Sequence, residues 1–293
     1  MRNIVSISVA PFQRVSEEEI SDRLTHGIPV GISARLSGLA SIAVVTVGDA
    51  DPAQLGVNRI LHGSVEVSED RVRVSVRLMD PANETIVWGP RVFERSMAEV
   101  FRLEAQITGE VVSTLGLVLA QGESRRLAKQ PTRDALAYGL YLKAIHQLHV
   151  LAPPQASDQA AASLLEAIER DPKFALAYAG LSVLYMSMGD TDDAEVFAQN
   201  ALALDADQAE AHWAMGWLHE ERGDWIEAQA SYEAGVRLSP SSSTLLSRHA
   251  RLLSWLGGFD RAVELMERAL LVDPTSWVRH MYAANIHRMA RNF

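Results

Sequence analysis

Apolar and polar positions follow two different patterns along the chain, one in residues 1–120 and another beyond residue 135. In the first part, short apolar or alternating runs bounded by turn residues predict five strands, at residues 4–9, 42–47, 60–67, 72–79 and 86–93. Apolar residues spaced by three and four predict amphipathic helices over residues 17–39 and 100–119. Strands and helices mixed in this way are typical of an α/β domain, here with a mixed sheet.

Helix-breaking residues modify this picture at two places. The helix over residues 17–39 is expected to bend or break because it contains three residues that disfavour a helix interior, Gly27, Pro29 and Gly31. Residues 121–134 are predicted to form a helical linker. Thr132 is expected to cap the helix that follows, by offering its hydroxyl oxygen to free backbone amides.

The second pattern is a repeat of 34 residues. Small residues recur in fixed phase, as do the prolines, for example at Ala160, Ala194, Ala228 and Ala262, and at Pro172, Pro240 and Pro274. The repeat predicts helix pairs over 135–151 with 157–170, 175–188 with 191–204, 209–222 with 225–238, and 244–256 with 259–271, followed by a helix over 277–291. Such a period is typical of paired helices stacked into a solenoid. The sequence therefore predicts an α/β domain (1–120), a linker (121–134) and an all-α solenoid (135–293).

The last predicted helix has no following partner in this array. Tyr282, Ile286 and Met289 are expected to be partly uncovered, since a solenoid needs a polar outer face on its terminal element. Two explanations stay open at this point. The chain is a truncated excerpt, or a second copy of the chain associates with this C-terminal edge.

These repeats resemble tetratricopeptide repeats (TPR), most closely at Met215-Gly216, Gly223, Ala228, Tyr232 and Pro240. The resemblance implies a groove along the first helix of each pair, lined by Met186, Trp213, Trp217, Glu220, Arg251, Trp255 and Met281. Repeats of this family that grip a carboxylate carry Lys, Arg and Asn in the groove, and only Arg251, Asn285 and Arg288 qualify here.

The groove is therefore expected to bind an apolar peptide or helix. Trp213 and Trp217 would be its rigid aromatic anchors. In the alternative hypothesis, the two tryptophans pack within the solenoid or against the N-terminal domain.

Residues 4–117 resemble the TolB-like amino-terminal domain that precedes TPR arrays in many bacterial regulatory proteins. The segments that carry the resemblance are Ser6-Ile7-Ser8-Val9-Ala10-Pro11-Phe12, Leu55-Gly56-Val57, Leu61-His62-Gly63-Ser64-Val65, Asp70-Arg71-Val72-Arg73-Val74, Leu78-Met79-Asp80, Val87-Trp88 and Val100-Phe101. In such relatives an output domain comes first, either a class III adenylate cyclase or a winged-helix DNA-binding domain. Neither precedes Met1, so the resemblance implies the regulatory half of such a protein or a stand-alone relative.

Composition narrows the function classes. The chain has no cysteine, which excludes disulfides and thiolate chemistry, and its formal net charge of −10 is spread evenly, which argues against nucleic-acid binding. The longest apolar stretches reach about ten residues, whereas a membrane-spanning helix needs about 20. We therefore expect a cytoplasmic chain that binds neither nucleic acid nor membrane.

Searching for chemistry yields no catalytic motif, so a non-enzyme without cofactor or metal is expected. His212 with His219 and His280 with His287 share a spacing of seven, but they occupy positions at which TPRs carry aromatic packing residues. His146 and His149 would need a third ligand to hold a metal. A stripe formed by Arg71, Arg73 and Arg77 is interpreted as a solvated sheet face paired to Glu66 or Glu94, with phosphate or acidic-partner binding as the alternative.

Three functional hypotheses remain. The first is a non-catalytic module of bacterial signalling in which the solenoid recruits a protein partner and the α/β domain tunes or relays that event. The second is the accessory half of an adenylate cyclase, and the third is the regulatory half of a winged-helix transcriptional regulator.

Overall fold

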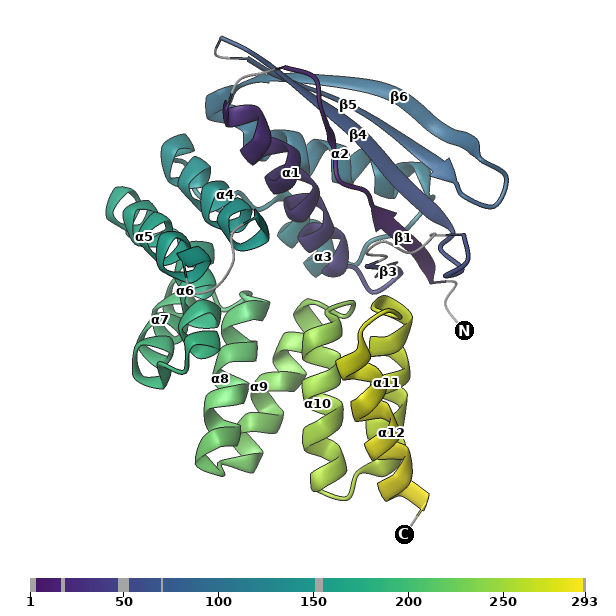
Figure 1. The fold of residues 1–293 in the computed structure, drawn as a ribbon, viewed down its shortest axis with the longest axis vertical. Helices are drawn as coiled ribbons and strands as arrows, with labels where there is room; N and C mark the ends of the chain where they lie inside the picture. Colours follow the sequence, from purple (N-terminus) through teal and green to yellow (C-terminus); the bar gives the residue numbers. More distant parts are fainter. Residues whose placement is uncertain (1–3, 17–18, 47–52, 70, 151–154, 292–293) are drawn as a thin grey trace.

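The computed structural model describes residues 4–16, 19–46, 53–69, 71–150 and 155–291. The N-terminal part is a twisted sheet covered on one face by helices (Figure 1). The strands β1 (Val5–Val9), β3 (Ile42–Val44), β4 (Arg59–Ser68), β5 (Arg71–Asp80) and β6 (Thr85–Ser96) lie in the order β3-β1-β4-β5-β6. β1 runs parallel to β3 and β4, whereas β4, β5 and β6 form an antiparallel meander. The predicted mixed sheet is confirmed, and a short strand β2 (Gln13–Arg14), which pattern alone did not indicate, pairs with β4.

The alternation in β5 has the predicted consequence. Its apolar residues are buried, and its arginines point to the other face. Arg71 pairs with Glu94, and Arg73 lies 3.7 Å from Glu66. These two arginines therefore belong to a solvated, ion-paired sheet face, as the pattern suggested.

Two of the covering helices differ from expectation. α1 (Glu19–Ser37) is one helix that passes through Pro29 without a break. α2 (Val100–Thr114) ends five residues earlier than predicted, at a turn where Gly116 has a φ of 64°. α3 (Gln121–Ala128) is separate from α2, and its Arg126 donates a hydrogen bond to the Gly38 carbonyl at the end of α1.

Thr132 is not the cap of the next helix. The backbone N–H groups of Leu136 and Ala137 donate to the carboxylate of Asp134, so Asp134 caps α4 (Ala135–Val150). The Thr132 hydroxyl instead bonds to the carboxylate of Asp171 and accepts from the backbone N–H of Asp134. Threonine and aspartate can both cap a helix, and Asp134 is the one that directly precedes the first residue of α4.

The helices α4 to α12 form the predicted stack of pairs. Its further members are α5 (Gln155–Arg170), α6 (Ala175–Met188), α7 (Thr191–Leu204), α8 (Ala209–Arg222), α9 (Trp225–Leu238), α10 (Ser243–Trp255), α11 (Phe259–Val272) and α12 (Trp277–Arg291). Gly189, Gly223 and Gly257 sit at the turns within pairs with φ near 80°, a conformation that glycine adopts without strain. The recurring alanines at 160, 194, 228 and 262 are fully buried where helices approach closely.

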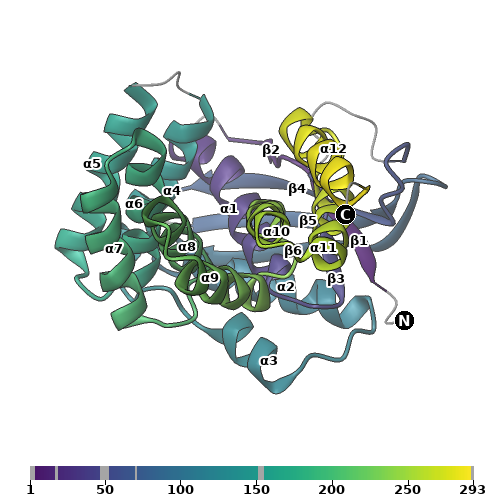
Figure 2. The same ribbon diagram turned by 90° about the horizontal axis from the view of Figure 1, so that it is seen from below.

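The sheet part rests on one edge of this helical arc (Figures 1 and 2). A single hydrophobic cluster runs from the sheet through α1 and α2 into α4, α5 and α6. A second contact lies farther along the solenoid, where the Ser241 N–H donates to the Ser37 carbonyl and the Thr46 N–H donates to the Val272 carbonyl. The solenoid thus touches the N-terminal part near both of its ends. The domain boundaries at 120 and 134 stay a prediction.

The terminal helix is better covered than expected. Ile286 is only 2% exposed because α12 packs on α10 and α11, and Tyr282 and Met289 are half-buried. The expectation of an uncovered edge is therefore wrong for Ile286. Exposed apolar surface on α12 lies instead at Trp277 and Met281.

Close helix packing at Gly216 gives a first testable prediction. A Cβ atom added there would lie 2.6 Å from two ring atoms of Tyr232, whose side chain is fully buried. Gly216→Ala is expected to lower the free energy of unfolding by about 1 to 3 kcal/mol through overpacking. The matched control is Gly139→Ala in α4, where a Cβ meets nothing within 4 Å and a gain of up to about 1 kcal/mol is expected. Urea denaturation of both variants measures the difference, and equal effects would contradict the packing register.

Candidate partner-binding groove

The seven residues predicted to line the groove lie on the first helices of successive pairs, α6, α8, α10 and α12. They divide into three groups by exposure. Met186, Trp213 and Glu220 are buried, Trp217 and Arg251 are half-buried, and Trp255 and Met281 are exposed. The set thus combines structural and accessible side chains.

Trp213 packs inside the solenoid. Its side chain is 8% exposed, and its indole N–H is buried without a hydrogen-bond partner among the described residues. It lines a cavity of about 230 Å³ together with Val183, Glu210, Ser242, Thr244 and Leu245. The packing alternative considered for the tryptophans therefore fits Trp213.

Trp217 is placed differently, on the accessible side of the same helix. Its ring meets that of Trp213 edge-on at 5.2 Å between centroids, and its indole N–H donates to Glu221 at 3.0 Å. The guanidinium of Arg248 lies over the Trp217 ring, 4.1 Å from its centroid. Sequence reasoning missed Arg248, although it lies three residues before Arg251 and so on the same side of the helix.

Glu220 and Arg251 hold each other in a network that joins four helices. Arg251 on α10 forms an ion pair with Glu220 on α8, and the Tyr232 hydroxyl on α9 donates to the other oxygen of Glu220 at 2.8 Å. Arg251 also lies 3.4 Å from the Tyr282 hydroxyl on α12. Burial, the nearby Glu220 charge and the hydrogen bond to Glu220 raise the pKa of Tyr232 well above its usual range. Glu220 and Arg251 therefore tie successive repeats together.

Trp255 ends α10 with half of its surface exposed. The Arg251 guanidinium lies 4.9 Å from its ring centroid, and the Trp225 ring meets it edge-on at 6.4 Å. A guanidinium thus lies close to each of two tryptophans of the predicted groove, Arg248 to Trp217 and Arg251 to Trp255.

The spaced histidines serve the repeat structure. His212 and His280 occupy equivalent positions, and each binds the backbone carbonyl six residues earlier, at Ala206 and Pro274, over 3.0 and 2.8 Å. His219 lies 3.7 Å from Asp224. His280 and His287 are more exposed than the packing interpretation implied. His146 meets His26 edge-on at 4.9 Å, and the side chain of His149 lies outside the described residues.

A buried carboxylate, which sequence reasoning missed, sits where α4 meets the N-terminal part. Glu104 on α2 accepts hydrogen bonds from the Tyr138 hydroxyl on α4 at 2.6 Å and lies 3.6 Å from Arg35 on α1. Burial raises the pKa of Glu104 to about 7, although Arg35 and the Tyr138 hydroxyl act in the opposite direction. In the sequence Glu104 is one polar position of an amphipathic helix, so no local pattern indicated this contact.

Basic residues of the linker also belong to this junction. Lys129 forms an ion pair with Asp205 in the loop before α8, and Arg35 donates to the Leu127 carbonyl. A cavity of about 330 Å³ opens between α1, α3 and the repeat loops, lined by charged groups of both signs. Lys129 and Arg126 therefore contact other elements of the fold as well as solvent.

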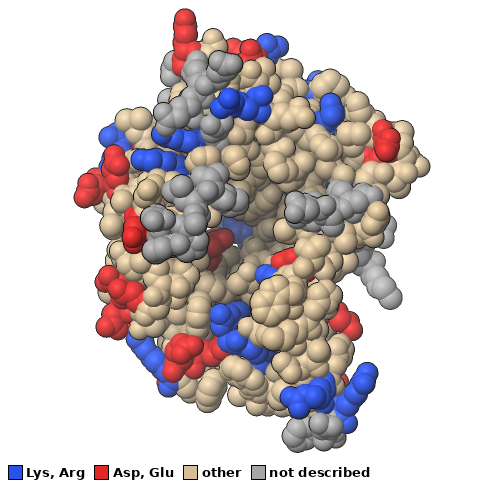
Figure 3. All heavy atoms as spheres, viewed as in Figure 1, with Lys and Arg blue, Asp and Glu red and all other residues tan. Residues whose placement is uncertain are grey.

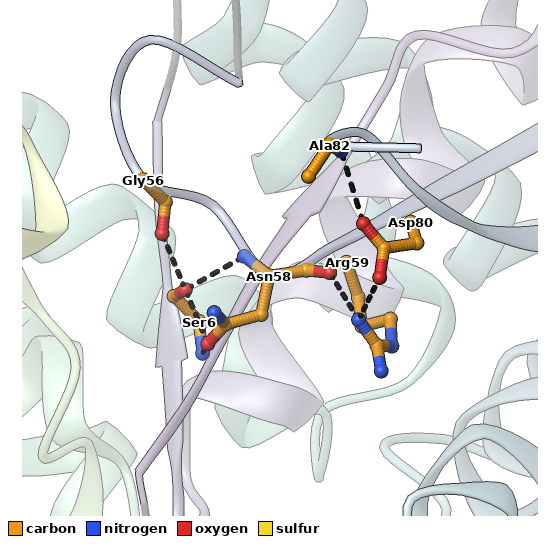
Figure 4. Close-up of polar contacts among 6 residues, drawn as sticks. All are labelled: Ser6, Gly56, Asn58, Arg59, Asp80 and Ala82. Carbon is orange, nitrogen blue, oxygen red and sulfur yellow. Dashed lines mark hydrogen bonds and ion pairs between the residues drawn. The ribbon is translucent and has the colours of Figure 1, made fainter. Parts of the chain in front are cut away.

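A further polar cluster lies at one edge of the sheet (Figure 4). The Asn58 N–H donates to the Ser6 hydroxyl oxygen, and the Ser6 N–H donates to the Asn58 side chain. Arg59 pairs with Asp80, whose other oxygen accepts from the Ala82 N–H. These hydrogen bonds hold the residues directly before β4 against β1, whereas Arg59 Nε is buried without a hydrogen-bond partner among the described residues.

Among the described residues, no three His, Cys, Asp or Glu side chains lie close enough together to hold a metal ion. Within the same ranges, no helix is long and apolar enough to cross a membrane.

Comparisons with known proteins agree with this architecture. Residues 156–218 match the tetratricopeptide repeat family model. The chain is 26% identical over 242 residues to a protein of Rhizobium meliloti (strain 1021) named "Putative adenylate cyclase 3", and the match covers 73% of this chain but 40% of that protein. The chain therefore spans less than half the length of this relative.

Two solved structures with low sequence identity are also similar. A thermophilic TPR protein of Thermus thermophilus shares 17% identity at a TM-score of 0.43, covering 65% of this chain and 91% of that one. Pseudomonas aeruginosa pilF shares 20% identity at a TM-score of 0.45, covering 54% and 70%. The C-terminal part of the chain contains tetratricopeptide repeats, a fold that serves protein–protein interaction and is generally non-catalytic.

Proposed function

We propose that this chain is a non-catalytic, cytoplasmic interaction and regulatory module of bacterial signalling whose TPR groove binds an apolar peptide or helix. The observation that carries the proposal is Trp217, a half-buried aromatic side chain braced by Trp213 beneath it and by Arg248 above it. Rigid, partly exposed aromatic residues in a concave surface are the usual anchors of binding energy. Trp255 on α10 and Met281 on α12 are further exposed apolar side chains on the first helices of later pairs.

The N-terminal part is proposed to be a TolB-like domain that tunes or relays partner binding. In support, two of its motif segments coincide with strands, Ser6–Val9 with β1 and Leu61–Val65 with β4. The continuous core into α4 and the Glu104–Tyr138 hydrogen bond give this domain a physical connection to the solenoid. A conformational change in the N-terminal domain would therefore alter the packing of α4 in the solenoid, and a change in the solenoid would alter the N-terminal domain.

Selection from a library of random peptides tests the groove. The peptides are displayed as internal segments with no free C-terminus, and selection on the wild-type chain is expected to enrich sequences with apolar anchors. Trp217→Ala should abolish that enrichment while circular dichroism and the melting temperature show an intact fold. The control, Trp88→Ala, removes a half-buried tryptophan of β6 outside the solenoid and should leave the enriched set unchanged. No enrichment on the wild type, or equal enrichment on Trp217→Ala, would refute groove binding.

A second candidate is the accessory half of an adenylate cyclase or of a winged-helix regulator. The likeness to the Rhizobium meliloti protein favours the cyclase version, since this chain covers only part of that protein. The coding sequence upstream of Met1 distinguishes them. A class III cyclase domain there supports the first, and a winged-helix domain supports the second. The absence of both domains supports a stand-alone module.

A further inference from the structure

The two helices that complete the C-terminal half of the groove carry only basic charge. α10 and α12 contain no Asp or Glu, whereas the whole chain has a formal net charge of −10. Their arginines are Arg248, Arg251, Arg279, Arg288 and Arg291. A basic segment in an acidic protein is a local electrostatic feature that composition as a whole conceals.

Internal carboxylates neutralise only part of this charge. Arg251 pairs with Glu220, and Arg279 lies 2.8 Å from Asp273. Within the described ranges, Arg248, Arg288 and Arg291 form no ion pair, and Arg288 and Arg291 are exposed. In the space-filling view, Lys and Arg side chains gather at the lower end of the molecule over α12 (Figure 3).

The arrangement of Arg248 leaves its donors available for an acceptor. The carbon of its guanidinium lies 4.1 Å from the centroid of the Trp217 ring, and Arg248 forms no ion pair among the described residues. The N–H donors of a guanidinium point outward in its plane and match the two oxygens of a carboxylate. Two acids of α8 already have partners, since Glu220 is buried against Arg251 and Tyr232, and Glu221 accepts a hydrogen bond from the Trp217 indole.

Arg288 lies on α12, which packs on α10. Met281, Asn285 and Arg288 are spaced by four and three residues, so they share one face of α12, and all three are exposed. Arg251 on α10 contacts α12 through Tyr282. The first helices α8, α10 and α12 therefore carry both accessible apolar side chains and arginines without an ion pair in the described part of the chain.

We propose that the C-terminal half of the groove selects an acidic partner segment, in which Asp or Glu side chains flank apolar anchors and pair with Arg248 and Arg288. This inference rests on the proposed groove function and specifies its partner. The apolar anchors would contact Trp217, Trp255 and Met281, and the carboxylates would meet the two arginines. Charge complementarity of this kind chiefly sets selectivity and association rate.

The peptides enriched in the library selection provide the test. Sequences selected on the wild-type chain are expected to carry net negative charge around their apolar anchors. The double variant Arg248→Gln/Arg288→Gln should enrich sequences without that bias, and it should bind a synthetic wild-type-selected peptide about tenfold more weakly at low salt. Raising the salt concentration should weaken wild-type binding and reduce the difference.

The control Arg237→Gln/Arg261→Gln removes the same charge from exposed positions on the second helices α9 and α11, and should retain the acidic bias and the affinity. Enriched sequences that are neutral or basic, or an unchanged bias in the Arg248/Arg288 variant, would overturn the acidic preference while leaving groove binding intact. Absence of any enrichment would instead be a failure of the proposed function itself, and with it of this inference.

Discussion

Replacing Glu220 with alanine is expected to lower the free energy of unfolding by about 3 kcal/mol or more. The Glu220 side chain is almost fully buried, and it neutralises Arg251 and accepts the Tyr232 hydroxyl. Its removal leaves a mostly buried guanidinium and a buried hydroxyl without their partner, and unpaired buried charges are costly. Arg251 already has its Nε atom buried without a hydrogen bond, so it has little capacity to compensate.

Adjacent residues supply the controls for this experiment. Glu221→Ala removes an exposed carboxylate that accepts a hydrogen bond from the Trp217 indole, and is expected to cost less than about 1 kcal/mol. The double variant Glu220→Met/Arg251→Met removes both charges and should recover most of the lost stability. Chemical denaturation of the three variants measures these differences. Similar losses for Glu220→Ala and Glu221→Ala would show that the network contributes little to folding.

The buried carboxylate of Glu104 is expected to make stability fall as the pH rises through neutrality. Its pKa in the folded chain is about 7, above the ordinary value of 4.5, so the folded state holds this proton more tightly than the unfolded state. The contribution of the proton to stability is complete below about pH 4.5 and is lost as the pH rises through about 7. A shift of this size corresponds to about 3 kcal/mol.

Glu104→Gln isolates this effect, because glutamine is neutral at every pH and can still accept the Tyr138 hydrogen bond. The stability of the wild type relative to Glu104→Gln should decline between pH 4.5 and pH 7.5 and then level off. Burial lowers the pKa values of His62 and His249, but both variants contain these histidines, so the subtraction removes their contribution. A difference that stays constant with pH would contradict a raised pKa at Glu104. Urea denaturation at a series of pH values measures it.

Local patterns were sufficient for the elements and for the repeat register. Alternation predicted β5 and the ion-paired face of Arg71 and Arg73, because side-chain direction in a strand depends only on residue parity. The 34-residue phase placed the helix pairs to within a few residues, since glycine at each turn and alanine at each close contact are requirements of every repeat. The resemblance to TPRs predicts a groove side on α8, α10 and α12, and the structure separates Trp213, which is buried, from Trp217, which is half-buried.

Two glycines led to the wrong expectation for α1, because glycine can either interrupt a helix or allow another element to pack closely against it. Gly27 and Gly31 are poor helix formers in isolation, yet both lie inside the unbroken helix α1. A Cβ at Gly27 would meet Leu142 at 2.7 Å, and one at Gly31 would meet Glu104 at 2.4 Å. These glycines therefore make room for α4 and for the buried carboxylate. Their packing partners lie more than 70 positions away in the sequence, so the spacing of apolar residues along α1 could not predict these contacts.

The sequence by itself determined the strand and helix periods, the repeat length and the acidic charge of the chain, because each depends on neighbours along the chain. Only the tertiary structure decided which polar residues are buried and with whom they pair. Glu104 meets Tyr138, Glu220 meets Arg251 and Tyr232, and Arg248 covers Trp217. Such pairings join separate helices, and burial strengthens them by excluding water, so their energies follow from the packed fold.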